Sequence, residues 1–313
     1  YSGGSGPDKN SPINTSFVSC NLLRNSFDRV TITPHVHTVQ HDNIKLSGGT
    51  VMEISTYVRP QSLEEAYSLL ADKKAFLIGG GAWSRMNSRK VELAVDLSSL
   101  DLRFIQKNGN NIEIGAMTTA RDLETSSELN KAFNGLFQKA VAHIVGVQMR
   151  NLITVGGTVG GKFGFSDLNT VLLALDAKVV LYKQGEIDFE SYLAGRTEGP
   201  ALIEKIVINT ENVHGSYEGV RISRTDFSIL NACAVRRNGS WRVTVGARPG
   251  GPRLSAKAAE VLGNVEHPDV NTAQKAGEAA AEELEFGNDV RGTSEYRTSV
   301  CRSLVKRAIQ EVA

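Results

Sequence analysis

The alternation of apolar and polar positions predicts a mixed chain of strands and helices that starts at Met52. Glu53–Val58 alternates with the period of a strand, and Pro60 ends it. Ser62 and Glu65 form a capping-box pattern, which predicts a helix whose apolar face carries Leu63, Ala66, Tyr67, Leu69 and Leu70. The same reasoning predicts strands at 75–78, 91–97, 112–115 and 177–182, and helices at 118–124 and 131–144.

The pattern changes near residue 210. Two apolar runs, Ile229–Arg237 and Trp241–Ala247, are joined by Asn238-Gly239, a strong hairpin signal. Helical patterns follow at 254–262, 271–286 and 293–312. We therefore predict an α+β protein with a first domain at 52–212, made of subdomains at about 52–108 and 109–212. A second domain follows at 213–313, and residues 1–51 are an extension of uncertain origin.

Charge and cysteine content narrow the classes of partner. The 35 Lys and Arg residues nearly balance the 34 Asp and Glu residues, so the chain lacks the excess of positive charge that favours binding to nucleic acid. No apolar run reaches the roughly 18 residues that a membrane-spanning helix needs, and no export signal is recognised. Cys20, Cys233 and Cys301 are too few and too far apart for a metal quartet or a disulfide framework. We therefore expect a cytoplasmic protein.

Glycine is frequent in this chain, at 30 of 313 residues, and it occurs in clusters. The first cluster, Gly79-Gly80-Gly81, directly follows the predicted strand at 75–78. Backbone amides that carry no side chains can converge there on an anion such as a diphosphate, although a tight turn would need the same residues. The segment matches neither the dinucleotide-binding fingerprint nor the Walker A loop.

The second glycine cluster runs from Gly156 to Gly164 and is predicted to be a loop. Thr154 and Thr158 flank its first glycine pair and add hydroxyl donors, while Asp167 follows as an acceptor for a sugar hydroxyl. Two anion-binding loops in one domain suit an extended dinucleotide that lies between two subdomains.

The order and spacing of several short motifs resemble the FAD-binding subunit of the molybdenum hydroxylases, the group of xanthine, carbon monoxide and nicotinate dehydrogenases. The resemblance extends from about Met52 to the C-terminus. In chain order the motifs are Tyr57–Pro60, Ser62–Ala66, Leu77–Gly81, Gln148–Asn151, Thr154–Gly157, Ser166–Leu168, Gly246-Ala247, Pro252-Arg253, Ala259-Glu260 and Asp289–Arg297. The resemblance implies a two-subdomain FAD-binding domain of the PCMH/VAO-like type, followed by a small C-terminal α/β domain with an antiparallel sheet and helices.

The resemblance also implies a set of cofactor contacts. The first glycine segment would wrap the FAD pyrophosphate, and the second would hold the pyrophosphate and ribityl region. Asp167 would bond FAD hydroxyls, and Arg221 or Arg224 would lie near the isoalloxazine, where a cation favours the anionic reduced flavin. The full implied set is Phe76, Leu77, Ile78, Gly79, Gly80, Gly81, Ala82, Trp83, Ile144, Thr154, Val155, Gly156, Gly157, Thr158, Asp167, Ile203, Arg221 and Arg224.

The function implied by the resemblance is electron transfer within a complex. FAD in this chain would receive electrons from the [2Fe–2S] clusters of a small partner subunit and pass them to NAD(P)⁺ or another acceptor. A large partner subunit would bind molybdopterin. The chain itself shows no catalytic triad, metal-ligand set or acid–base pair, as expected when the cofactor carries the chemistry.

One departure from the family pattern leaves alternatives open. After the glycine pair the family usually has Thr or Ser and then Asp or Asn, whereas this chain has Gly81-Ala82. The missing polar contacts lower the affinity that we expect for FAD. The alternatives are a free-standing FAD reductase similar to the UDP-N-acetylenolpyruvoylglucosamine reductases, and a structural scaffold that has lost FAD.

Some conspicuous residues have simpler explanations. His35, His37 and His41 look like a metal cluster, but no patterned carboxylates accompany them. Cys233 follows a strand period and is expected in the core. Trp83 either stacks on a flavin or adenine ring or packs under the first glycine loop.

Overall fold

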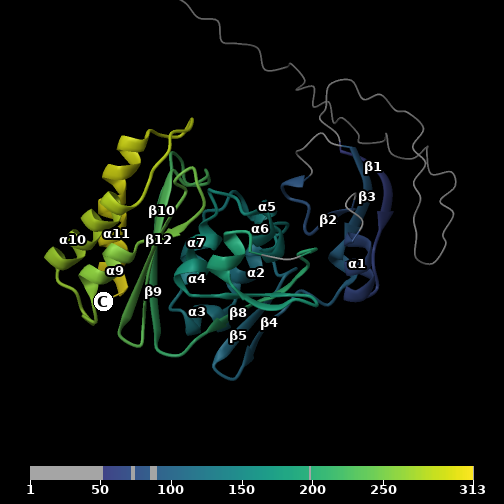
Figure 1. The fold of residues 1–313 in the computed structure, drawn as a ribbon, viewed down its shortest axis with the longest axis horizontal. Coiled ribbons are helices and arrows are strands. Elements are labelled where there is room, and N and C mark those ends of the chain that lie inside the picture. The colour runs from purple at the N-terminus through teal and green to yellow at the C-terminus, as the bar shows by residue number, and fades with distance from the viewer. Residues whose placement is uncertain (1–51, 72–74, 85–89, 197–198, 313) are drawn as a thin grey trace, which may run out of the picture.

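The structure is a computed structural model that describes residues 52–71, 75–84, 90–196 and 199–312. His35, His37, His41 and Cys20 lie outside the described residues. Three parts follow one another along the chain, each with its own sheet (Figure 1). None of the described helices combines the length and apolar character that crossing a membrane requires.

The first part is a small parallel sheet with one helix. Its strands run in the order β1-β3-β2, and α1 packs beside them around a core that includes Ala66, Val95 and Leu97. The Ser62 hydroxyl accepts the Glu65 amide at 3.1 Å, as the capping pattern predicts. The elements are β1 (Glu53–Val58), α1 (Leu63–Leu70), β2 (Ala75–Ile78) and β3 (Lys90–Asp96).

The middle part is a five-stranded antiparallel sheet in the order β4-β5-β8-β6-β7, packed against short helices. Its strands are β4 (Ile105–Asn108), β5 (Asn111–Gly115), β6 (Lys178–Leu181), β7 (Gly185–Asp188) and β8 (Ile203–Asn209). Its helices are α2 (Ala120–Thr125), α3 (Ser127–Ala132), α4 (Leu136–Val141), α5 (Val147–Arg150), α6 (Val155–Gly161), α7 (Asp167–Ala174) and α8 (Phe189–Leu193). These elements enclose the largest apolar core of the described chain.

Two sequence-based expectations for the middle part need correction. The predicted helix at 131–144 is interrupted at Gly135, whose φ of 76° is left-handed, so α3 and α4 form instead. The second glycine cluster is largely helical, as α6, rather than a loop. Because β4 pairs with β5, the change from the first sheet to the second comes before Ile105.

The C-terminal part is an antiparallel sheet in the order β12-β11-β10-β9, with three helices on one face. Helices α4 and α7 of the middle part contact the strands from the other side (Figure 1). The predicted hairpin is confirmed, since Asn238 and Gly239 take the left-handed φ values of 48° and 82° that its turn requires. The elements are β9 (Val213–Val220), β10 (Leu230–Arg237), β11 (Ser240–Gly246), β12 (Arg253–Leu254), α9 (Ala256–Leu262), α10 (Val270–Glu283) and α11 (Ser294–Val312).

Candidate cofactor site

The two glycine segments, about seventy residues apart in the sequence, are in direct contact. A Cβ atom placed on Gly80 would lie 1.6 Å from the carbonyl oxygen of Leu152, and one on Gly79 would lie 2.7 Å from the Thr154 hydroxyl oxygen. No side chain fits into such gaps. Glycine at these two positions therefore allows the turn after β2 to rest on the chain that leads into α6.

Polar donors at this contact remain unused within the described part of the chain. The amides of Gly80 and Gly81 make no hydrogen bond to another described residue, and the φ of 70° at Gly81 turns the backbone away from β2. The buried Thr154 hydroxyl accepts the Gly157 amide at 3.2 Å but has no acceptor for its own proton among the described residues. Amides and a hydroxyl proton without an acceptor suit the oxygens of a diphosphate, so the residues present fit the diphosphate of FAD.

The first amides of α6, in contrast, are already bonded inside the protein. Val155 donates to Thr118 O at 2.8 Å, Gly156 to Ala116 O at 2.7 Å, and Thr158 to Thr154 O at 2.9 Å. The Thr158 hydroxyl also donates to Thr154 O. A pyrophosphate contact from 154–158 thus depends on the Thr154 hydroxyl, while the amides of Val155 and Gly156 fix α6 against the chain just after β5.

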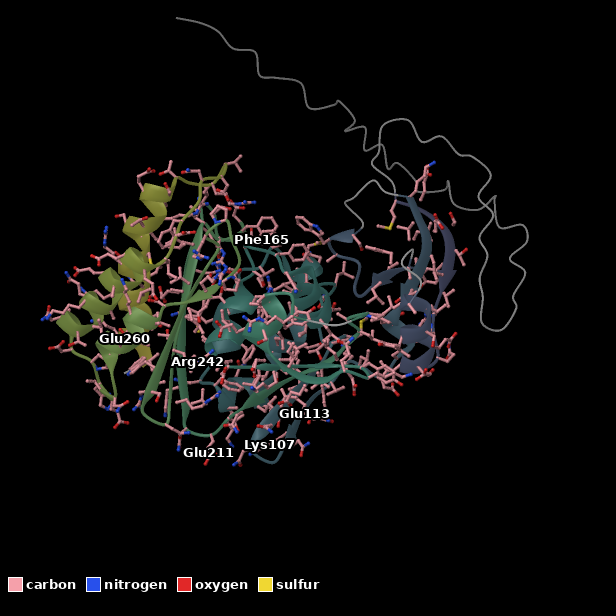
Figure 2. The ribbon with its side chains drawn as sticks, viewed as in Figure 1. Lys107, Glu113, Phe165, Glu211, Arg242 and Glu260 are labelled. Carbon is pink, nitrogen blue, oxygen red and sulfur yellow. The ribbon has the colours of Figure 1, made fainter. Side chains whose placement is uncertain are left out.

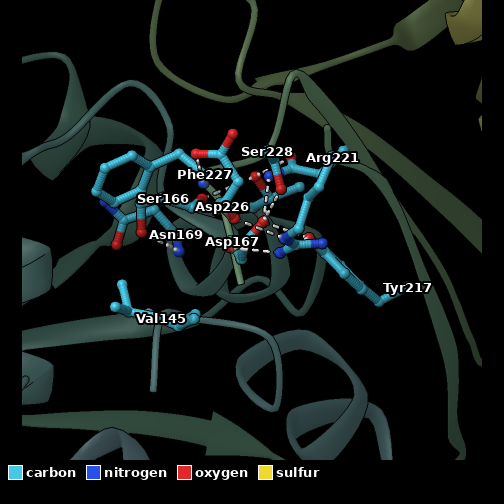
Figure 3. Close-up of polar contacts among 12 residues, drawn as sticks. Val145, Ser166, Asp167, Asn169, Tyr217, Arg221, Asp226, Phe227 and Ser228 are labelled. Atoms are coloured by element: carbon cyan, nitrogen blue, oxygen red, sulfur yellow. Dashed lines mark hydrogen bonds and ion pairs between the residues drawn. The ribbon is translucent and has the colours of Figure 1, made fainter. Parts of the chain in front are cut away.

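Asp167, at the start of α7, is the centre of a buried polar network (Figure 3). Its Oδ1 accepts hydrogen bonds from the Tyr217 hydroxyl, from Ser228 Oγ at 2.5 Å and from Asn231 Nδ2 at 2.8 Å. Its Oδ2 pairs with Arg221 Nη2 at 2.8 Å, and only 6% and 7% of the two side chains are exposed. The network therefore joins the middle part to β9 and β10.

The network changes the acid–base behaviour of its members. Burial lowers the pKa of Arg221, but the charges of Asp167 and Tyr217 and the hydrogen bonds to both groups together outweigh burial, so the pKa lies above its usual value. Burial, followed by the Asp167 charge, raises the pKa of Tyr217 well above its usual value. The positive charge of Arg221 is therefore paired with the carboxylate of Asp167. Arg224 is exposed and forms no hydrogen bond or ion pair with any described residue.

The turn at 142–146 lies close to these arginines. Burial lowers the pKa of His143, and the charges of Arg221, Arg224 and Arg150 add to that effect. Arg150 holds the turn in place, because its guanidinium donates to the carbonyl oxygen of Val145 at 3.1 Å.

The conformation of this turn is unusual for its residue type. Val145 has a left-handed φ of 47°, which is rare for a β-branched residue. Its neighbour Ile144 packs, partly buried, against the core of the middle part. Nothing in the sequence signals this backbone geometry.

An aromatic cluster, consisting of Trp83, Phe163, Phe165 and Phe227, lies where the three parts approach one another. The ring centroid of Trp83 is 5.1 Å from that of Phe163, 5.7 Å from that of Phe165 and 6.3 Å from that of Phe227. Phe165 lies between the upper loops of the C-terminal part and the helices of the middle part (Figure 2). The Arg291 guanidinium carbon lies 5.2 Å from the centroid of the Phe227 ring. Sequence reasoning named Trp83 but missed the three phenylalanines.

The loop that carries Arg291 is fixed by a buried arginine at the start of α11. Arg297 is fully buried and donates to the carbonyl oxygens of Ile229, Gly287 and Gly292 at 2.9, 2.7 and 2.5 Å. It also pairs with Asp289 at 2.5 Å. This motif holds the β9–β10 connection against the C-terminal helices.

The remaining predicted site residues lie in or around the same region. Ile203, on β8, is buried beneath α6, and its Cδ1 would lie 3.7 Å from a Cβ on Gly160. Val155 is in the core, and Ala82 lies in the turn after Gly81. Phe76, Leu77 and Ile78 form β2 and lead into that turn.

Comparison with known sequences decides the family. Residues 51–209, more than half of the 313-residue chain, match the FAD binding domain in molybdopterin dehydrogenase, and residues 215–312 match the CO dehydrogenase flavoprotein C-terminal domain. The chain belongs to this family of FAD-binding oxidoreductase subunits. The resemblance seen in the sequence motifs is therefore confirmed.

Individual members of the family cover most of the chain. The glyceraldehyde dehydrogenase medium chain of Sulfolobus acidocaldarius is 26% identical over 276 residues, which are 82% of this chain and 98% of that protein. The carbon monoxide dehydrogenase medium chain of Hydrogenophaga pseudoflava is 25% identical over 81% of this chain and 95% of its own length. A solved structure of carbon monoxide dehydrogenase from Hydrogenophaga pseudoflava matches with a TM-score of 0.75 at 24% identity, over 84% of this chain and 97% of that chain. The predicted α+β fold with an antiparallel C-terminal sheet is thereby confirmed.

Proposed function

We propose that this chain is the FAD-binding electron-transfer subunit of a molybdenum hydroxylase complex, with NAD(P)⁺ or another acceptor as the final oxidant. The observation that carries the proposal is the contact of the two glycine segments, with unused donors on both sides, in a chain of the FAD-binding family. When bound, FAD supplies the redox chemistry, and the protein binds, orients and tunes it.

Each part of the site contributes a distinct task. The amides of Gly80 and Gly81 and the hydroxyl of Thr154 hold the diphosphate. Of the two candidate cations, Arg224 is the one that remains available to stabilise negative charge on the isoalloxazine, because Arg221 is engaged by Asp167. The contact of Asp167 with FAD hydroxyls stays a prediction, and in it Asp167 would share its oxygens with four protein donors.

The names of the relatives support the partners that we propose. Several are called medium chains or medium subunits of larger dehydrogenases and hydroxylases. We therefore expect a large subunit that binds molybdopterin and a small subunit with [2Fe–2S] clusters. Electrons enter from the small subunit in this proposal.

An absorbance spectrum of the purified complex tests the cofactor assignment. We expect flavin bands that correspond to a single FAD in each copy of this chain, together with co-purifying molybdopterin and iron–sulfur subunits. Reoxidation of the reduced flavin by NAD⁺ or NADP⁺ then identifies the acceptor. A folded chain that stays colourless after incubation with FAD would instead support the scaffold alternative, which the Gly81-Ala82 departure favours.

A further inference from the structure

Trp83 has an unusual environment for so large an apolar ring. Its side chain is 41% exposed, although three phenylalanine rings support part of it. It lies two residues after Gly81, in the same turn as the unused amides. The adenine and the isoalloxazine of FAD are each joined to the diphosphate through a ribose or a ribityl chain, so a dinucleotide held by those amides can bring one of its ring systems to this turn.

The aromatic cluster behind Trp83 makes that surface rigid. Phe163 and Phe165 are stacked, with centroids 5.4 Å apart and an interplanar angle of 16°, and Phe165 is 4.3 Å from Phe227. These rings come from the chain after α6 and from the β9–β10 connection. The indole is thus fixed by both the middle and the C-terminal parts, which lowers the entropy cost of binding a planar ligand.

Cations around the cluster distinguish between the two ring systems of FAD. Phe227 belongs to the same connection as Arg224, and the Arg291 guanidinium lies over the Phe227 ring. Reduction adds negative charge to the isoalloxazine, whereas adenine stays neutral. Arg291 is paired with Asp289 at 3.6 Å, whereas Arg224 forms no ion pair with any described residue, so the charge of Arg224 suits the isoalloxazine better than adenine.

We propose that Trp83 stacks on the isoalloxazine ring of FAD, with Phe163, Phe165 and Phe227 as its support. The inference rests on the proposed function and deepens it. Stacking on the indole replaces the hydroxyl and the carboxylate or amide contacts that Gly81-Ala82 lacks relative to the family pattern.

Two substitutions test the contact in the reconstituted holoprotein. Trp83→Phe keeps a ring for stacking but removes the indole, which transfers an electron to an excited flavin at contact distance. We expect Trp83→Phe to bind FAD about as tightly as the wild type and to lengthen the fluorescence lifetime of the bound flavin. Trp83→Ala removes the stacking surface and should weaken FAD binding by roughly tenfold, or about 1.4 kcal/mol.

Trp241→Phe is the matched control, because it removes the only other indole of the chain. Trp241 is buried in the C-terminal part, and its Nε1 donates to Val265 O at 2.8 Å. We expect this variant to leave both the lifetime and the affinity for FAD unchanged. Thermal melting of each apoprotein checks that the fold is retained.

The outcomes separate this inference from the proposed function. A wild-type protein that is folded and binds no FAD overturns the proposed function, and the inference with it. If FAD binds but the lifetime is unchanged in Trp83→Phe and the affinity is unchanged in Trp83→Ala, the stacking is refuted while FAD binding stands. A third outcome is that Trp83→Ala weakens the binding of ADP as much as the binding of FAD, while Trp83→Phe leaves the flavin fluorescence lifetime unchanged. The stacked ring is then adenine, and the assignment to the isoalloxazine is wrong.

Discussion

At the scale of single residues, Asp167 has the most consequential contacts. Four protein groups bind its carboxylate, and its ion pair with Arg221 is almost fully buried. Asp167→Ala leaves the Arg221 charge and the donors of three other side chains without a partner. We expect the free energy of unfolding to fall by about 3–5 kcal/mol, measured by denaturant titration.

Asp101→Ala is the control for that experiment, because Asp101 is exposed and should change stability by less than about 0.5 kcal/mol. Adding Arg221→Met to Asp167→Ala should restore part of the loss, since it removes the unpaired charge. Equal stability of the Asp167→Ala and Asp101→Ala proteins would contradict the structural role of the network.

His143 predicts a dependence of stability on pH. Its folded pKa lies below the ordinary value of about 6.5 because of burial and the charges of Arg221, Arg224 and Arg150, with Asp167 opposing them. The unfolded chain therefore binds the proton more tightly. His143 should therefore not affect the free energy of unfolding above about pH 6.5. Below that pH the free energy of unfolding should fall, because protonation favours the unfolded chain.

The measurement is the melting temperature at about pH 8 and about pH 5 for the wild type and His143→Gln. Glutamine does not titrate, so the variant should lose less of its melting temperature on acidification. Identical losses in the two proteins would show that His143 does not carry the effect.

At the scale of elements, α6 makes a sharp prediction because its glycines differ in their surroundings. A Cβ on Gly156 would lie 2.9 Å from both the Cβ and the carbonyl oxygen of Ala116, whereas a Cβ on Gly160 meets nothing closer than 3.7 Å. Gly156→Ala should lower the melting temperature and the flavin content. Gly160→Ala should be neutral or stabilising by up to about 1 kcal/mol, since alanine favours the helix. Similar behaviour of the two variants would argue against the close packing of α6 on β5.

The elements also show what the sequence can and cannot predict. Period-two patterns predicted β1 and the β10–β11 hairpin correctly, because local alternation and turn chemistry determine them. The helix α6 was missed, because its glycines disfavour a helix locally and its amides are bonded to Ala116 and Thr118, far away in sequence. The strand β9 was not predicted, because residues such as His214 and Tyr217 stand among its apolar positions and obscure the alternation.

At the scale of the whole molecule, the candidate site is assembled from all three parts. The glycine segments could be identified from the sequence, because clustered glycines signal close backbone approach. The partners of Asp167 could not, because they lie on β9, on β10 and in the connection between them, fifty or more residues away. The rings around Trp83 could not either, because they come from the chain after α6 and from the same connection. A polar Asn231 inside an apolar strand was one local sign of the buried network.

The most direct test of the central claim is an equilibrium titration of the wild type, Gly80→Ala and Gly251→Ala with FAD. A Cβ on Gly80 would lie 1.6 Å from the Leu152 carbonyl oxygen, whereas one on Gly251 would have no atom within 4 Å. We predict that the wild type and Gly251→Ala bind a single FAD with equal affinity. Gly80→Ala should bind at least roughly tenfold more weakly while keeping its fold by circular dichroism. Wild-type affinity in Gly80→Ala would contradict the claim that contact between the glycine segments builds the FAD site.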